Sequence, residues 1–90
     1  MKSLRYTKQF KKDLKRYTNQ PSKLIELNKV MRMLENEIPL PKEYRDHKLH
    51  GEYEGCRECH LEGDFLLIRY DEATNTIALY RLGSHSELFG

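Results

Sequence analysis

Long apolar runs are missing from this sequence. No stretch of its 90 residues approaches the roughly 20 apolar residues that a membrane-spanning helix requires. Basic residues occur in the first segment, MKSLRYTKQF, but no apolar signal-peptide core follows it. We therefore expect a protein without a membrane partner that stays in the cytoplasm, where thiols remain reduced. The length and the lack of repeats, low-complexity tracts and linkers predict one domain over residues 1–90.

Cysteine is scarce, and both cysteines fall in one motif, C-R-E-C-H, from Cys56 to His60. The spacing matches a haem attachment box, but an export signal is lacking and the chain leaves little room for a haem pocket. A structural zinc site needs four ligands, and a redox dithiol needs a helix N-terminus in a βαβ context. On the strand predicted here, residues three apart point to opposite faces. We therefore expect no haem, zinc or other cofactor, with Cys59 in the core and Cys56 partly exposed without a role.

Acidic residues are scarce in the first third of the chain. Residues 1–25 carry eight Lys and Arg against a single acid, Asp13, although the net charge of the whole protein is only +2. A basic segment on a nearly neutral protein suggests an acidic partner such as nucleic acid. A solvated helix face rich in lysine explains the charge equally well, so both interpretations stay open at this point.

Helical periodicity dominates the first half. A first helix from Thr7 carries an apolar stripe at spacing i, i+4, i+7, formed by Phe10, Leu14 and Tyr17. Asn19-Gln20-Pro21 ends it and begins a second helix. The apolar seam of that second helix runs through Leu24, Leu27, Met31, Leu34 and Ile38, up to Pro39-Leu40-Pro41. The two helices are expected to form an antiparallel hairpin.

The second half changes to the period of strands. Residues 55–62, 64–71 and 77–82 alternate, with a hairpin turn at 71–75, and residues 2–6 and 47–51 could add short strands. Residues 83–86 read as a break followed by a capped final turn. The predicted fold is therefore α+β: β-α-α followed by an antiparallel sheet of three to four strands, with the helical hairpin packed on one face.

All four histidines also fall in the second half, between residues 47 and 85. If the predicted strands are neighbours, four polar side chains come together at one end of the sheet: His60, Asp64, Arg81 and His85. A lone histidine is more often structural than functional, but several histidines with an acid and an arginine favour a site.

Such a set suits cleavage of an RNA phosphodiester. The reaction needs a base for the 2′-OH, an acid for the leaving 5′-oxygen and a cation for the phosphorane charge, and no metal is required. Histidine acts as acid or base near neutral pH, and an arginine fork matches phosphate oxygens. Phe65 and Phe89 could stack on bases of single-stranded RNA.

Three blocks of the sequence resemble the YafQ branch of the RelE superfamily, toxins of type II toxin–antitoxin systems. They are L-P-x-x-Y-R-D-H-x-L-x-G (Leu40 to Gly51), G-C-R-E-C-H-L-E-G-D-F-L-L-I-R-Y (Gly55 to Tyr70) and R-L-G-S-H-S-E-L-F-G (Arg81 to Gly90). The resemblance implies an mRNA interferase, a ribosome-dependent endonuclease that cuts messenger RNA without metal and is blocked by a cognate antitoxin.

The resemblance also implies roles for individual residues. The acid–base groups fall at His60, Asp64 and His85, the phosphate-contacting cation at Arg81, and substrate positioning at His47 and Phe89; Phe65 completes the set. Which group is base and which is acid stays open. Contact with ribosomal RNA phosphates would come from the basic helix, through Lys8, Lys11, Lys12, Lys15 and Arg16. The same surface, or the neighbouring helical groove, could hold an acidic antitoxin segment.

Two positions depart from the family pattern. Phe65 stands where Trp commonly follows the Asp, so an indole donor is lost, and Cys56 stands where Tyr is usual. Two alternatives remain: gyrase-inhibiting toxins share the fold but cut nothing, and a plain RNA-binding module would also carry basic and aromatic residues. Neither would need His60, Asp64, Arg81 and His85 together.

Overall fold

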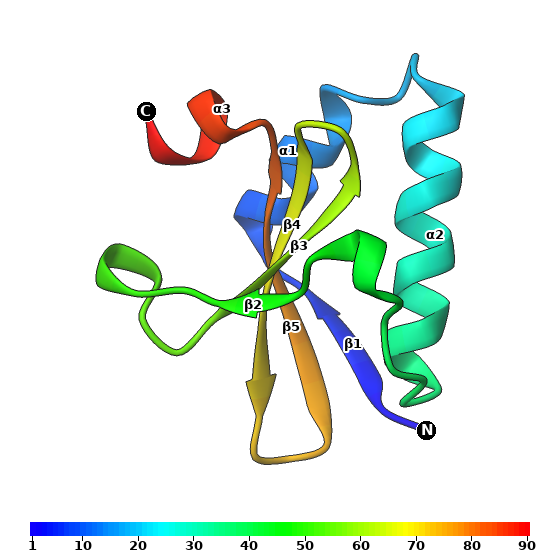
Figure 1. Ribbon diagram of the computed structural model, residues 1–90, viewed down its shortest axis with the longest axis vertical. Coiled ribbons are helices and arrows are strands. Elements are labelled where there is room, and N and C mark those ends of the chain that lie inside the picture. The colour runs from blue at the N-terminus through cyan, green and yellow to red at the C-terminus, as the bar shows by residue number, and fades with distance from the viewer.

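The computed structural model describes residues 1–90 as a five-stranded sheet with helices packed against it (Figure 1). In chain order the elements are β1 (Ser3–Tyr6), α1 (Lys8–Lys15), α2 (Pro21–Glu35), the 3₁₀ turn η1 (Lys42–Tyr44), β2 (His47–Lys48), the 3₁₀ turn η2 (Gly51–Tyr53), β3 (Arg57–Glu62), β4 (Phe65–Glu72), β5 (Thr76–Gly83) and α3 (His85–Phe89). The strand order is β1-β5-β4-β3-β2. The predicted α+β fold is confirmed, but the sheet has five strands and is mixed, because β1 pairs with β5 in parallel.

The helix α1 begins where Thr7 caps it. Thr7 Oγ1 accepts a hydrogen bond from the backbone N–H of Phe10 at 3.1 Å and donates to the carbonyl of Leu79 at 2.9 Å. One hydroxyl therefore both starts the helix and ties it to β5. The predicted burial is confirmed, since Phe10 and Tyr17 are buried and Leu14 packs against the same core. The helix is shorter than predicted, because it ends at Lys15 and Tyr17 lies in the turn beyond it.

The helix α2 is shorter than its apolar seam predicted. It begins at Pro21 and ends at Glu35, so Ile38 lies beyond it and is 52% exposed. Glu37 adopts a left-handed conformation with φ of 57°, and the N–H of Ile38 donates to the carbonyl of Met33 at 2.9 Å. These contacts form a Schellman stop without the glycine that usually marks one. None of the helices is both long enough and apolar enough to cross a membrane.

The sheet buries side chains on both faces. The larger core joins α1 and α2 to one face, and Cys59 lies fully buried within it. The smaller core, on the other face, contains Cys56, Leu66, Ile68 and Leu88. The prediction that the two thiols diverge is therefore confirmed, and Cys59 fills the core as expected. The prediction that Cys56 is partly exposed is wrong: it is 2% exposed, because α3 brings Leu88 onto this face.

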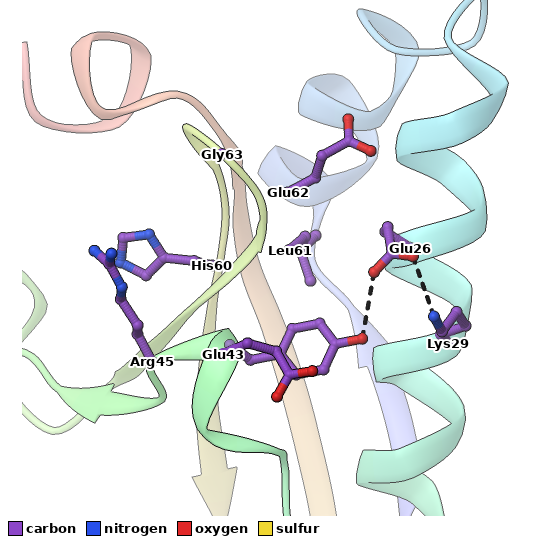
Figure 2. Close-up of a pocket in the computed structure, with 9 residues that line it drawn as sticks. Glu26, Lys29, Glu43, Arg45, His60, Leu61, Glu62 and Gly63 are labelled. Atoms are coloured by element: carbon purple, nitrogen blue, oxygen red, sulfur yellow. Dashed lines mark hydrogen bonds and ion pairs between the residues drawn. The ribbon is translucent and has the colours of Figure 1, made fainter.

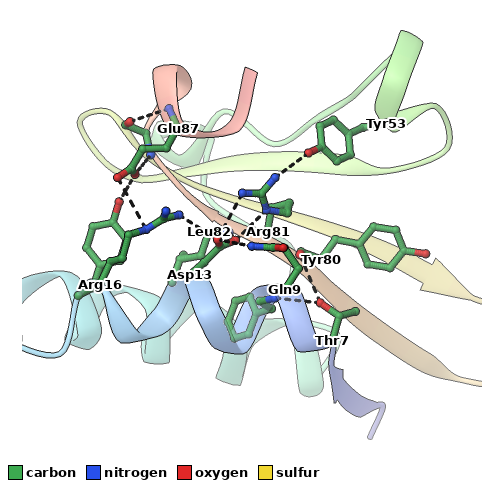
Figure 3. A network of polar contacts seen from close by, with 12 residues as sticks. Thr7, Gln9, Asp13, Arg16, Tyr53, Tyr80, Arg81, Leu82 and Glu87 are labelled. Carbon is green, nitrogen blue, oxygen red and sulfur yellow. Dashed lines mark hydrogen bonds and ion pairs between the residues drawn. The ribbon is translucent and has the colours of Figure 1, made fainter. Parts of the chain in front are cut away.

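A charged residue lies at the centre of the contact between α1 and β5 (Figure 3). Asp13 is fully buried and accepts hydrogen bonds from Arg81 Nε at 2.8 Å and from the backbone N–H of Leu82 at 2.9 Å. Gln9 and Arg16 donate to it as well. Burial alone would raise the pKa of Asp13, but these hydrogen bonds outweigh it and hold the pKa below its usual value.

Replacing Asp13 by Ala is expected to lower the free energy of unfolding by about 3–5 kcal/mol, because Arg81 and the N–H of Leu82 lose a buried partner. The depressed pKa means that the stabilisation by Asp13 is present at neutral pH and is lost as pH falls through the folded-state pKa. Urea unfolding measures both effects. Glu52→Ala serves as the control, since Glu52 is exposed and should change stability little; equal losses in both variants would contradict the role of Asp13.

Candidate active site

His85 and Asp64 form a hydrogen-bonded pair at one end of the sheet. Asp64 lies in the turn between β3 and β4, and His85 is the first residue of α3. Asp64 Oδ1 lies 2.6 Å from His85 Nδ1 and 3.0 Å from the backbone N of His85. A carboxylate only accepts hydrogen bonds, so Nδ1 carries the hydrogen and Nε2 is left to exchange a proton with another molecule. The two hydrogen bonds from His85 hold the pKa of Asp64 below its usual range.

The short helix α3 fixes the orientation of His85. Ser84 Oγ accepts from the backbone N–H of Glu87, and the carboxylate of Glu87 accepts from the backbone N–H of Ser84, which completes a capping box. Glu87 is itself held by the hydroxyl of Tyr17. Gly83 precedes the cap, and a Cβ there would lie 2.7 Å from Glu87 Oε1. A larger residue at this position would therefore displace the carboxylate of Glu87 from the capping box.

A second cluster of polar side chains, from β2 and β3, lies beside His85. The ring centroid of His60 is 5.8 Å from that of His85 and 6.1 Å from that of His47. Glu58, which is 2% exposed, places Oε1 3.3 Å from His47 Nε2 and 3.8 Å from His60 Nε2. Its other oxygen, Oε2, is buried without a hydrogen-bond partner. The predicted residues His60, Asp64 and His85 are thus together, joined by His47 and by Glu58.

His47 contacts a backbone carbonyl with one ring nitrogen and a buried carboxylate with the other. Its Nδ1 lies 2.7 Å from the carbonyl oxygen of Arg45, so that nitrogen is a donor. Its Nε2 lies 3.3 Å from Glu58 Oε1. The site therefore places an imidazole next to a carboxylate, an arrangement suited to proton transfer.

The same three side chains could hold a metal ion. One ligand atom from each of His47, Glu58 and His60 lies within 4.8 Å of the others. Imidazole and carboxylate are common ligands of zinc and copper, and a cation would satisfy the unpaired Oε2 of Glu58. The sequence-based expectation assigned no metal ligand here and did not consider Glu58. The sequence could nevertheless have indicated Glu58, because residues 58 and 60 share a face of the predicted strand.

Arg81 lies apart from the histidines. It pairs across the sheet with Ile68, which pairs with Glu58, two rows from the row of His60 and Gly83. Its guanidinium contacts Asp13 and the hydroxyl of Tyr53, at 3.1 Å for the latter. We expected Arg81 to lie together with the imidazoles, but its guanidinium makes no direct contact with them. Phe89 does border His85, with ring centroids 6.0 Å apart, and is 46% exposed.

The expectation that Phe65 stacks on an RNA base is wrong. Phe65 is 1% exposed and lies in the larger core, 4.7 Å from the ring of Tyr17. The alternation of β4 turns it toward the helices, whereas Asp64 just before it lies in the turn. No ring surface remains for a base, so Phe65 anchors the start of β4 and thereby supports Asp64.

A hollow of about 570 Å³ adjoins the site between α2, η1 and the end of β3. In Figure 2, Glu26 and Lys29 of α2 lie on one side of this hollow and Arg45 with His60 on the other. Tyr44 also lines it. Only His60 among the predicted acid–base groups lines it. The hollow therefore gives access to one edge of the site, while His85 and Asp64 lie on the open surface.

The basic residues of α1 form a separate exposed surface. Lys8, Lys11, Lys12 and Lys15 are exposed and have no ion-pair partner. Arg16 instead contacts Asp13 at 2.9 Å and Glu87 at 3.8 Å. The four lysines are free for an anionic partner, whereas Arg16 is already engaged in the network that carries α3.

Removing the His85 side chain is expected to raise the pKa of Asp64 toward its ordinary value, because one of its two hydrogen bonds is lost. Carboxyl-carbon NMR titration of wild type and His85→Ala measures this change. His50→Ala provides the control, since His50 is exposed and does not contact Asp64. An unchanged Asp64 pKa in His85→Ala would show that the pair is not formed in solution.

Comparison with known proteins identifies relatives along the whole chain. The family described as "Bacterial toxin of type II toxin-antitoxin system, YafQ" matches residues 2–90. The mRNA interferase toxin YafQ of Escherichia coli K12 is 34% identical over 90 residues, which covers 99% of this chain and 97% of the relative.

Solved structures agree in fold. A metal-bound toxin from Helicobacter pylori superposes with a TM-score of 0.89 at 44% identity, covering 99% of this chain and 100% of that one. YafQ in the E. coli DinJ–YafQ complex superposes with a TM-score of 0.86 at 33% identity, with full coverage of both chains. The family match, the identities and the shared architecture lead to one conclusion: this chain belongs to the YafQ family of toxins of type II toxin–antitoxin systems.

Proposed function

We propose that this chain is an mRNA interferase that cleaves translated messenger RNA on the ribosome, using the 2′-OH of the substrate as the nucleophile. The E. coli relative is named as an mRNA interferase. The proposal rests on two imidazoles whose ring centroids lie 5.8 Å apart. One is His85, hydrogen-bonded to Asp64, and the other is His60, next to Glu58. Two such groups on one open surface can serve as the base and the acid of the reaction.

The proposed reaction needs no metal. One imidazole removes the proton of the 2′-OH, and the 2′-oxygen attacks the adjacent phosphorus. The other imidazole protonates the leaving 5′-oxygen, and the product is a 2′,3′-cyclic phosphate. Asp64 orients His85 and stabilises its charged form. Glu58 does the same for His60 and His47, which approach it from two strands. Arg81 supplies positive charge for the phosphates of the strand from its position next to Tyr53.

Two partners follow from the proposal. The lysines of α1 have no ion-pair partner in the chain and can contact ribosomal RNA phosphates. A cognate antitoxin would neutralise this toxin, as the E. coli YafQ relative forms a complex with DinJ. A gyrase inhibitor or a plain RNA-binding module would explain the lysines, but neither would need a carboxylate at hydrogen-bond distance from His85.

Loss of a proton-transfer group is expected to lower mRNA cleavage by about 10²–10⁴-fold. His85→Ala removes the anchored imidazole, and Glu58→Gln removes the charge shared by His47 and His60. Mapping of mRNA 5′ ends in a translating extract measures cleavage, and chelation with EDTA should leave the wild-type rate unchanged. His50→Ala and Glu54→Gln are the matched controls, because both side chains are exposed.

Three results would contradict the proposal: wild type that cuts no translated message, His85→Ala that cuts as wild type does, or cleavage that stops when EDTA is added. The last result would favour a metal held by His47, Glu58 and His60.

Replacing Lys11 and Lys15 by Ala is expected to weaken binding to ribosomes and to flatten the dependence of affinity on salt, because two phosphate contacts are removed. Sedimentation binding at several salt concentrations measures both quantities. Lys42→Ala with Lys48→Ala removes the same charge from elsewhere on the surface and serves as the control. If the control weakens binding as much as the α1 variant does, α1 is not the contact surface.

A further inference from the structure

We propose that a hollow next to Arg81 binds a nucleotide of single-stranded RNA that neighbours the cleaved one. The hollow is shallow and open to solvent, has a volume of about 370 Å³ and is lined by Arg5, Thr7, Gln9, Tyr53, Tyr80 and Arg81. In Figure 3, Tyr53 and the amide of Gln9 lie beside the Arg81 guanidinium, and the ring of Tyr80 extends away from it; all four residues line the hollow. The inference rests on the proposed function, because the RNA that reaches this hollow is the substrate of His60 and His85.

A bulge in the sheet creates the hollow. Ile68 of β4 pairs with Arg81 of β5, but the next residue, Arg69, pairs with Leu79, so Tyr80 is the extra residue. A bulge changes the direction of side chains on its strand. Leu79 and Leu82 on either side both enter the larger core. Tyr80 and Arg81 therefore both line the same hollow, although neighbours on a regular strand would point to opposite faces.

Aromatic rings connect the hollow to the active site. Tyr53 packs edge-on against Phe89, with ring centroids 5.7 Å apart, and Phe89 lies 6.0 Å from His85. On the other side, Tyr80 stacks with Tyr70 at 5.9 Å, which fixes the orientation of its ring. Single-stranded RNA is bound by such series of rings because every base has a face that can stack. An RNA strand at His85 can thus continue past Phe89 to Tyr53 and Tyr80.

Arg81 offers the hollow a fixed positive group. A guanidinium has five N–H donors, and Asp13 and Tyr53 accept three of them. The remaining donors can bind a phosphate oxygen, and the buried Asp13 prevents the group from turning away. Gln9 is held by its amide nitrogen, which donates to Asp13, so its amide oxygen is left to accept a hydrogen bond from an exocyclic amino group. Adenine offers both such an amino group and a large stacking face.

The test uses a short fluorescein-labelled oligoadenylate whose 2′-hydroxyls are methylated, so that it binds without being cleaved. Fluorescence anisotropy measures its affinity for the intact protein. Tyr80→Ala is expected to weaken binding about 5- to 100-fold, the range typical for one base stacked on an aromatic ring. Tyr80→Phe should bind as wild type does, because it keeps the ring. Tyr6→Ala is the matched control, since Tyr6 is exposed and does not line the hollow.

A second measurement does not depend on the fold of a variant. Adenosine 5′-monophosphate added to labelled wild-type protein should shift the backbone amide signals of Tyr53, Tyr80 and Arg81. Oligoadenylate binding that is unchanged in Tyr80→Ala, or amide shifts confined to His60 and His85, would overturn the inference. Loss of antitoxin binding in Tyr80→Ala with unchanged RNA binding would also overturn it, because the face would then bind protein. Cleavage of translated mRNA by wild type tests the proposed function separately from all of these results.

Discussion

The ion pair between Asp13 and Arg81 is the contact on which the arrangement of the site depends. Asp13 is the single acid in a strongly basic segment, and it is fully buried where α1 meets β5. Its carboxylate binds the side chain of Arg81 and the backbone of Leu82, so it fixes the strand and the cation together. A buried carboxylate is tolerated only with such complete pairing. The helix that presents lysines to solvent is thus attached to the strand that leads into α3.

The histidines are held in a different way, by short-range contacts on β2, β3 and α3. His85 is set by a capping box and by Asp64, and Glu87 of that capping box also binds Tyr17. His47 and His60 share the carboxylate of Glu58. Each of these imidazoles therefore has a carboxylate neighbour: Glu58 lies on β3, and Asp64 lies in the turn before β4 and accepts two hydrogen bonds from His85. Sites built on helix ends and strands keep their geometry better than sites on loops.

Much of this architecture could be predicted from the sequence, because apolar spacing separates helices from strands. The stripe of α1, the divergence of the cysteines and the grouping of His60, Asp64 and His85 all follow from periods of 3.6 and 2. The sequence-based predictions fail where local backbone geometry interrupts the period of a helix or a strand. Glu37 ends α2 without a glycine signal, and the bulge at Tyr80 turns Tyr80 and Arg81 to the same face of the sheet.

Burial of single residues was harder to predict than their spacing. Phe65 and Cys56 are covered by Tyr17 and Leu88, which come from distant parts of the chain. Asp13 was counted as one charge among many, although tertiary contacts make it the best-buried polar group. Glu58 could have been recognised from its shared face with His60. Its proximity to His47 depends on the pairing of β2 with β3, which no local pattern specifies.

The parallel pairing of β1 with β5 has a consequence for how the chain assembles. Ser3 pairs with Thr76, so the first strand has no neighbour until β5 has been synthesised. Contacts between such distant residues slow folding. His85 follows β5 in the chain. A nascent chain therefore lacks the complete site until the ribosome has added the residues beyond β5.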